Sequence, residues 1–195
     1  MIIIKKMFWI YTLPFLFLIG YIFVAFIFKV IKEVIKKEVS LEDFTKEVDV
    51  RYARCDTVYN SLEKLNNYHK IVLLTNDTML FMNEYSISLI TVKNYIGTIK
   101  GNEDDKILTI KSEEELEVEN PKILLNKVYD KIKEKIPNYE VKKYLILGTV
   151  CITNLKYKDI KILRMNNYYY YINKLGKQKI YTKEIIDKVF EDLKW

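Results

Sequence analysis

Residues 86–97 read SISLITVKNYIG. Lys93 directly follows the mostly apolar part of this stretch, residues 87–92. The β-branched types within residues 87–92 suit a buried central strand. Because side chains alternate between the two faces of a strand, Thr91 and Lys93 share one face. A lysine at the end of such a strand has two interpretations: its stem reaches water past the strand edge, or a site uses its charge.

The other residues that often carry chemistry are scarce. His69 is the only histidine, which excludes a histidine-rich metal site and argues against a Ser-His-Asp triad. The two cysteines, Cys55 and Cys151, form no metal-binding pattern. We interpret them as reduced, buried thiols of a domain that faces the cytoplasm.

A basic stripe near the C-terminus is interleaved with tyrosines, Tyr157 and residues 168–171. It could stack single-stranded nucleic acid, dock on anionic lipid, or be the solvated side of a strand pair, which is the simplest interpretation. Its members are Lys156, Lys158, Lys161, Arg164, Lys174, Lys177 and Lys179.

Two acidic runs, residues 103–105 and 113–119, precede the helix that Pro121 opens. A solvated loop is the simplest interpretation of residues 112–120, and a cation-binding or partner-binding patch is the alternative. Acidic side chains near a site would repel a nucleic-acid backbone.

The net charge of +6 is concentrated at the N-terminus, where residues 1–37 hold six lysines and one glutamate. Residues 7–28 are 22 residues without a charge, long enough as a helix to cross a hydrocarbon core of about 30 Å. More lysines follow this segment than precede it, so we expect a single-pass protein of the cell membrane with its C-terminal part in the cytoplasm. Residues 1–39 are then a membrane anchor that contacts the lipid bilayer, and residues 40–195, nearly neutral, are one domain.

The periodicity of residues 40–195 predicts a mixed α/β domain with a central mixed sheet and helices on both faces. We expect helices at 44–65, 121–135 and 182–193, the second capped by Asn120 and the third by Thr182. The expected strands are 69–74, 79–82, 87–92, 95–100, 107–110, 144–152, 160–163 and 168–172.

Part of this domain resembles a known family. Residues 83–97 match a pattern in which a turn and an apolar strand lead to K-N-Y-x-G, and Asn120-Pro121 matches an N-P that opens the next helix. Residues 182–193 match the final helix. On these features, residues 52–193 resemble the NERD (nuclease-related domain) family, a branch of the PD-D/E-x-K nuclease superfamily.

The resemblance implies a restriction-endonuclease-like fold with an αβββαβ core and a divalent metal held by carboxylates beside a lysine. The first-helix glutamate of the family aligns near Asp56, and the second-strand aspartate falls at Thr78. The glutamate of E-x-K is Thr91, its lysine is kept as Lys93, and the helix glutamine falls at Leu124.

Because two acids and the glutamine are missing, we expect a catalytically inactive domain with no metal and no cofactor. It would bind or scaffold a protein partner, or bind nucleic acid weakly, and Lys93 would be held by Asp56 or by water. The alternative is a membrane-anchored nuclease whose Mg²⁺ or Mn²⁺ site has shifted to Asp56, Asp77 or Glu84. Asp77 is one residue from Thr78, and in a strand that would turn it to the opposite face.

Overall fold

The computed structural model of the protein describes residues 51–174 and 178–193. The expected membrane helix at 7–28 and the domain boundary at residue 39 lie outside this part of the chain. Within it, no helix is long and apolar enough to cross a membrane.

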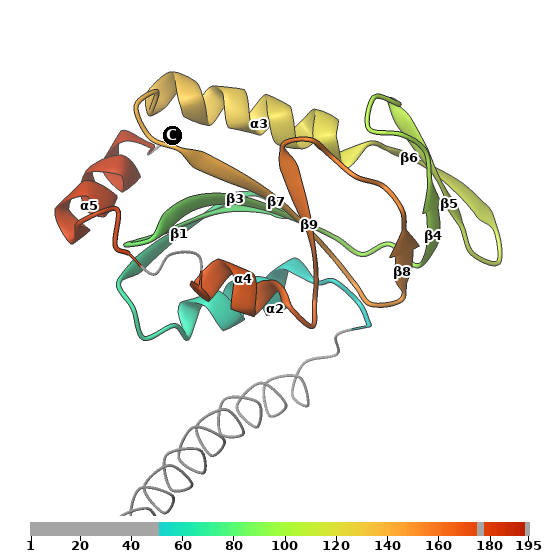
Figure 1. Cartoon of the computed structure of the whole chain (residues 1–195), viewed down its shortest axis with the longest axis horizontal. Helices are drawn as coiled ribbons and strands as arrows, with labels where there is room; N and C mark the ends of the chain where they lie inside the picture. The colour runs from blue at the N-terminus through green and yellow to red at the C-terminus, as the bar shows by residue number, and fades with distance from the viewer. Residues whose placement is uncertain (1–50, 175–177, 194–195) are drawn as a thin grey trace, which may run out of the picture. The chain divides into compact units, whose positions relative to one another are not determined.

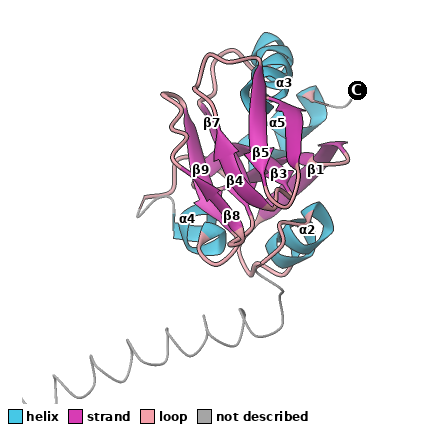
Figure 2. Cartoon of the chain, turned by 90° about the vertical axis from the view of Figure 1, so that its right-hand side faces the viewer, coloured by secondary structure: helices cyan, strands magenta, loops and turns pink. Residues whose placement is uncertain are grey.

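The described residues form a mixed α/β structure with two sheets, as Figures 1 and 2 show. A five-stranded sheet has the order β1-β2-β3-β7-β9, in which β1 to β3 are antiparallel and β3, β7 and β9 are parallel. Its strands are β1 (His69–Thr75), β2 (Thr78–Asn83), β3 (Ser86–Lys93), β7 (Val141–Leu147) and β9 (Ile160–Arg164).

A smaller sheet has the order β6-β5-β4-β8. Its strands are β4 (Gly97–Lys100), β5 (Ile107–Lys111), β6 (Glu115–Glu119) and β8 (Cys151–Thr153). The chain passes from the large sheet to the small one twice, between β3 and β4 and between β7 and β8. The neighbours β3 and β7 are parallel in the large sheet, and β4 and β8 are parallel in the small one. Lys93 therefore ends its strand where two neighbouring strands leave the large sheet.

Helices cover both faces of the large sheet, as expected (Figure 1). One face packs against α3 (Pro121–Lys135) and α5 (Lys183–Asp192), which bury Leu125 and Val189 in a core shared with Leu89 of β3. The other face is covered by α2 (Cys55–Glu63) and α4 (Tyr168–Lys174). Because both faces are covered, β2 and β3 are buried at every position except the terminal Lys93.

The caps of two helices are confirmed. Asn120 accepts a hydrogen bond from the Lys122 backbone amide at 3.1 Å, and Pro121 fills the first turn, where no amide donor is needed. Thr182 accepts from the amide of Ile185 at 3.4 Å. The helix expected at 44–65 is confirmed for Cys55–Glu63, whereas residues 51–54 and 64–65 are not helical. The part expected at 44–50 lies outside the described residues.

The loop expected at residues 112–120 is wrong, because Glu115–Glu119 forms β6. Leu116 and Val118 alternate with glutamates and lie opposite Ile110 and Leu108 of β5. The two apolar residues thus give the strand one apolar face, which the acidic composition concealed. The glutamates of this strand alternate to the other face, and Glu115 forms an ion pair with Lys111.

The strand expected at 168–172 is also wrong, because these residues form α4. Tyrosine is enriched in strands, but strand propensity depends on context, and tertiary packing overrides it here. Tyr168 and Ile172 are four residues apart, fully buried, and on one side of the helix. The Tyr168 hydroxyl makes a short hydrogen bond with the hydroxyl of Ser61 in α2, which ties the two helices together.

The strand expected at 144–152 is two strands in different sheets. The break falls at Gly148, where an added Cβ would lie 2.1 Å from the carbonyl oxygen of Arg51. Only a residue without a side chain lets these two backbone segments approach so closely, and the chain turns there from β7 to β8.

Candidate functional site

Lys93 forms an ion pair with Asp77, whose Oδ2 accepts from the lysine Nζ. The two side chains are partly buried, with exposed fractions of 24% for Lys93 and 30% for Asp77. Asp77 lies in the turn between β1 and β2, and its backbone carbonyl accepts from the Val92 amide at 2.8 Å. This bond fixes the turn against the end of β3, so the carboxylate meets the lysine.

Three threonine hydroxyls complete the cluster around Asp77. Thr75 donates to Oδ1 of Asp77 at 2.8 Å, and Thr78 donates to the same oxygen at 3.1 Å. The Thr78 and Thr91 hydroxyls lie 3.0 Å apart, because these residues are direct partners across β2 and β3. Both carboxylate oxygens of Asp77 are therefore engaged within the protein.

The surroundings of Asp77 favour its ionised form. Burial by itself would raise the pKa of the carboxyl, but the hydrogen bond from Lys93, those from Thr75 and Thr78, and the charge of Lys93 together lower it. Nearby, burial and then the charge of Asp77 raise the pKa of Tyr95 to about 12. At neutral pH the cluster is thus a carboxylate paired with an ammonium and surrounded by neutral hydroxyls.

The expectations for Asp56 and Asp77 need correction. Asp56 lies on α2 with its side chain 67% exposed, 3.8 Å from Arg54. Among the described residues, the ion pair of Lys93 is with Asp77 and not with Asp56. The expectation that Asp77 faces away from the lysine fails because Asp77 is in a turn, where strand alternation does not apply.

The remaining candidates lie on other elements. Glu84 is in the turn at the opposite end of β2 and β3, where Lys179 binds its carboxylate at 2.8 Å. Leu124 lies half-buried in α3 beside Leu125, a fully buried core residue. The structure therefore brings together Asp77, Thr78, Thr91 and Lys93 from the predicted set.

This cluster is a poor site for a divalent cation. Such cations require several oxygen ligands, usually including charged carboxylates, and here the one acid in hydrogen-bond contact with Lys93 is neutralised by it. The neighbouring donors are hydroxyls, which supply no charge. Among the described residues there is no group of three or more histidine, cysteine or acidic side chains that could hold a metal ion.

The predicted basic stripe is divided by the fold. Arg164 donates to the backbone carbonyls of Gly148, at 3.1 Å, and Cys151, so it supports the turn between β7 and β8. Lys179 pairs with Glu84, while the side chain of Lys174 and all of Lys177 lie outside the described residues. The three other members, Lys156, Lys158 and Lys161, line a groove of about 650 Å³ at β7 and β9.

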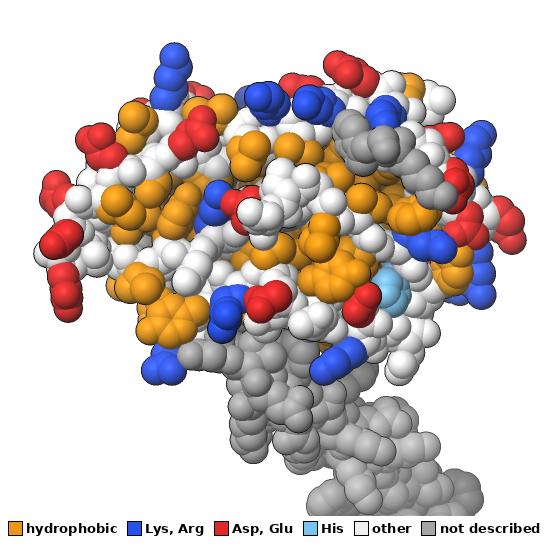
Figure 3. Space-filling model, turned by 180° about the vertical axis from the view of Figure 1, so that it is seen from behind, with side chains coloured by type: hydrophobic (Ala, Val, Ile, Leu, Met, Phe, Trp, Pro, Cys, Tyr) orange, Lys and Arg blue, Asp and Glu red, His pale blue; other side chains and the backbone are white. Residues whose placement is uncertain are grey.

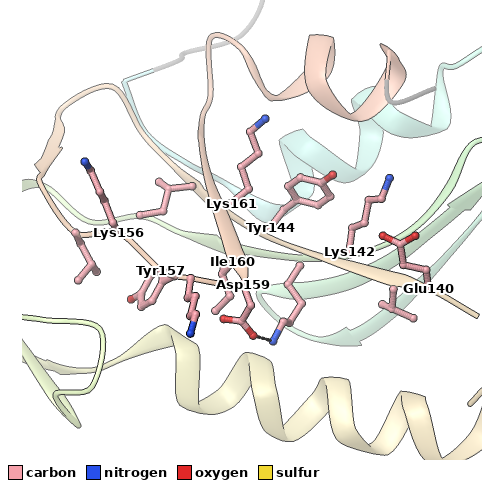
Figure 4. Close-up of a pocket in the computed structure, with 13 residues that line it drawn as sticks. Glu140, Lys142, Tyr144, Lys156, Tyr157, Asp159, Ile160 and Lys161 are labelled. Carbon is pink, nitrogen blue, oxygen red and sulfur yellow. Dashed lines mark hydrogen bonds and ion pairs between the residues drawn. The ribbon is translucent and has the colours of Figure 1, made fainter. Parts of the chain in front are cut away.

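The sequence analysis missed two further lysines of this groove, Lys142 (Figure 4) and Lys143. They lie on β7, about 15 residues before the stripe, and only the parallel pairing of β7 with β9 brings them beside it. Their signal in the sequence was a pair of charges at the start of an apolar strand. On the view in Figure 3, acidic and basic side chains are interspersed and no large area carries a single sign of charge.

Comparison of the chain with protein-family models, with curated proteins and with solved structures finds no match.

Proposed function

We propose that residues 40–195 form a non-catalytic binding domain of restriction-endonuclease-like fold, held at the cytoplasmic face of the membrane by residues 1–39. The observation that carries this proposal is the Asp77–Lys93 ion pair. A metal-dependent nuclease needs that lysine beside a cation and its bound water. In this protein the lysine is paired with a carboxylate whose other oxygen accepts from two hydroxyls.

The order of elements supports the fold part of the proposal. The chain runs α2, β1, β2 and β3, passes through β4 to β6 of the smaller sheet, and continues with α3 and β7. The β1-β2-β3 unit is antiparallel, and β7 returns parallel to β3. Without the inserted β4 to β6, the order is α2-β1-β2-β3-α3-β7. This is the αβββαβ order of the nuclease core that the resemblance implies. The strand that ends in Lys93 is central in that sheet.

The membrane anchor is the second part of the proposal, and it rests on the uncharged residues 7–28 and on the lysines that follow them. Protease added to intact cells is expected to leave the domain whole, and protease added to opened cells is expected to digest it. Digestion by protease added outside intact cells would contradict the proposed orientation. Recovery of full-length protein in the soluble fraction would contradict the proposed membrane anchor.

A metal-dependent nuclease with a displaced site is the second candidate function. The observation that favours it is the position of Asp77, which contacts Lys93 and Thr78 at the place where the family's acids are expected. In this alternative Asp77 would leave Lys93 to bind Mg²⁺ or Mn²⁺.

A cleavage assay separates the two functions. The purified full-length chain with Mg²⁺ or Mn²⁺ is expected to leave single-stranded DNA, duplex DNA and RNA intact. Each preparation should be matched by Asp77→Ala and Lys93→Met variants purified in the same way. Cleavage by the wild type that both substitutions abolish would establish the nuclease and overturn the binding domain.

A further inference from the structure

The lysine-lined groove at β7 and β9 is a charged feature that the Asp77–Lys93 cluster does not use. It lies where β7 begins before its neighbour β9, and the segment from β8 to β9 closes its side. Its lining includes five lysines and only two acids, Glu140 and Asp159. One of these lysines, Lys143, already has partners within the protein. It forms an ion pair with Asp159, donates to Asn126 at 2.7 Å and lies over the ring of Tyr129.

The other lysines of the groove have no acidic partner among the described residues. Within the described part of the chain, no carboxylate lies within ion-pair distance of Lys142, Lys156 or Lys158, and Lys161 lies 3.8 Å from the centre of the Tyr171 ring. Elsewhere in this structure lysines do find acids, as Lys122 does with Glu103 at 2.7 Å. Lysines without acidic partners around one hollow concentrate positive charge there, which attracts anions.

A tyrosine hydroxyl provides a neutral donor in the same place. Tyr144 is only 3% exposed, and its hydroxyl makes no hydrogen bond with another described residue. Burial, and then the charge of Glu140, raises the pKa of Tyr144 to about 12, so the hydroxyl keeps its proton and can donate at neutral pH. Lys142 and Tyr144 share one face of β7, and Lys161 is the direct partner of Tyr144 on β9.

Figure 4 shows these three side chains on the same side of the sheet, away from α3, while Asp159 points toward α3. Asp159 is therefore turned away from Lys142 and Lys161, and Glu140, the other acid of the groove, forms no ion pair with either lysine among the described residues. The result is a row of donors, two cationic and one neutral, with Lys156 further along the groove.

The groove does not provide a platform for stacked bases. Tyr157 is only 9% exposed, and its hydroxyl donates to Asn120 at 2.7 Å. The ring of Tyr144 is buried as well, and Lys161 covers Tyr171. Single-strand binding proteins gain much of their affinity by stacking bases on exposed rings, so this groove favours the phosphate over the base.

We propose that the groove formed by Lys142, Tyr144, Lys156 and Lys161 binds a phosphate-bearing ligand. Lysine binds phosphate as a point charge, and a protonated hydroxyl adds a directed hydrogen bond to a phosphate oxygen. The ligand is either a soluble phosphate compound or the phosphomonoester headgroup of a lipid. This inference names the ligand class of the proposed binding domain and rests on that function, but it does not involve Asp77 or Lys93.

The test is calorimetric titration of the full-length protein in neutral phosphatidylcholine nanodiscs with inorganic pyrophosphate, in metal-free buffer. A parallel arm compares nanodiscs that contain phosphatidic acid with neutral ones, and measures protection of Lys142 and Lys161 from acetylation. Saturable binding in either arm is the expected result, and the arm that responds identifies the source of the phosphate. Loss of the hydrogen bond in Tyr144→Phe should weaken binding about tenfold, and Lys142→Gln with Lys161→Gln should weaken it further.

The matched control is Lys127→Gln with Lys131→Gln, which removes the same charge from exposed positions of α3 outside the groove. It should leave the affinity within about twofold of the wild type. Equal losses in the control and the groove variant would overturn the site. So would the absence of binding in both arms, or binding of a single-stranded oligonucleotide without any response to pyrophosphate or phosphatidic acid. A positive cleavage assay with intact phosphate binding would instead refute only the non-catalytic function.

Discussion

Replacing Thr78 with aspartate and Thr91 with glutamate is expected to make the stability of this domain depend on a metal ion, which we do not expect for the wild type. Both positions are fully buried and directly opposite each other, with hydroxyls 3.0 Å apart. The variant therefore places two new carboxylates beside Asp77. Without metal these like charges repel one another and lack solvation, so the melting temperature should fall by several degrees.

Mn²⁺ should then restore stability, because a cation that binds only the folded state stabilises it by about 2.7 kcal/mol at a hundredfold excess over Kd. Scanning calorimetry of the full-length chain with and without Mn²⁺ measures both effects. The matched control is Thr78→Asn with Thr91→Gln, which has the same shapes without the charges and should not respond to the metal. A variant that melts at the same temperature with and without Mn²⁺ would show that the three carboxylates do not converge.

Removing Asp77 is expected to cost roughly 2–3 kcal/mol of unfolding free energy in Asp77→Ala. The substitution leaves Lys93 as a partly buried cation without its partner, and it removes the acceptor of the Thr75 and Thr78 hydroxyls. Urea unfolding should show the loss, and adding Lys93→Met should recover part of it. The control is Asp56→Ala, an exposed acid on α2, whose loss should cost less than about 0.5 kcal/mol.

The same pair predicts a pH dependence. The pKa of Asp77 is lower in the folded protein than its ordinary value of 3.8. Its contribution to stability is therefore fully present above that ordinary value and is lost as the pH falls through the lower, folded pKa. In Asp77→Ala this acid-side loss should disappear. If Asp77→Ala and Asp56→Ala both lower the unfolding free energy by less than about 0.5 kcal/mol, the Asp77–Lys93 ion pair does not stabilise the cluster.

Local patterns predicted most of the elements that position this cluster. Residues 121–135 combine a cap, a proline and helical periodicity, and α3 has those bounds. Thr91 and Lys93 lie on one face because side chains alternate along β3. This strand is buried at every position before Lys93, so its register had little freedom. The antiparallel pairing of β2 with β3 then sets Thr78 opposite Thr91.

The errors arose where distant parts of the chain determine the result. Tyr168 is helical because it packs on Ser61, more than a hundred residues earlier, and local propensity carries no trace of that contact. Gly148 separates β7 from β8 because its backbone meets Arg51. The partner of Lys93 was misjudged because Asp77 was treated as a strand residue, and only the tertiary contact of its turn with Val92 shows how it reaches the lysine. The groove could not be predicted because it depends on the pairing of β7 with β9, two strands that are separated in the chain by β8.

The most direct test of the central claim, that Asp77 neutralises Lys93 where a nuclease would hold its cation, is a calorimetric titration of the full-length wild type with Mn²⁺. The Thr78→Asp with Thr91→Glu variant serves as the positive control in the same buffer. We predict no saturable heat for the wild type and a saturable binding curve for the variant. Stoichiometric Mn²⁺ binding by the wild type that Asp77→Ala abolishes would contradict the account and place a metal at Asp77.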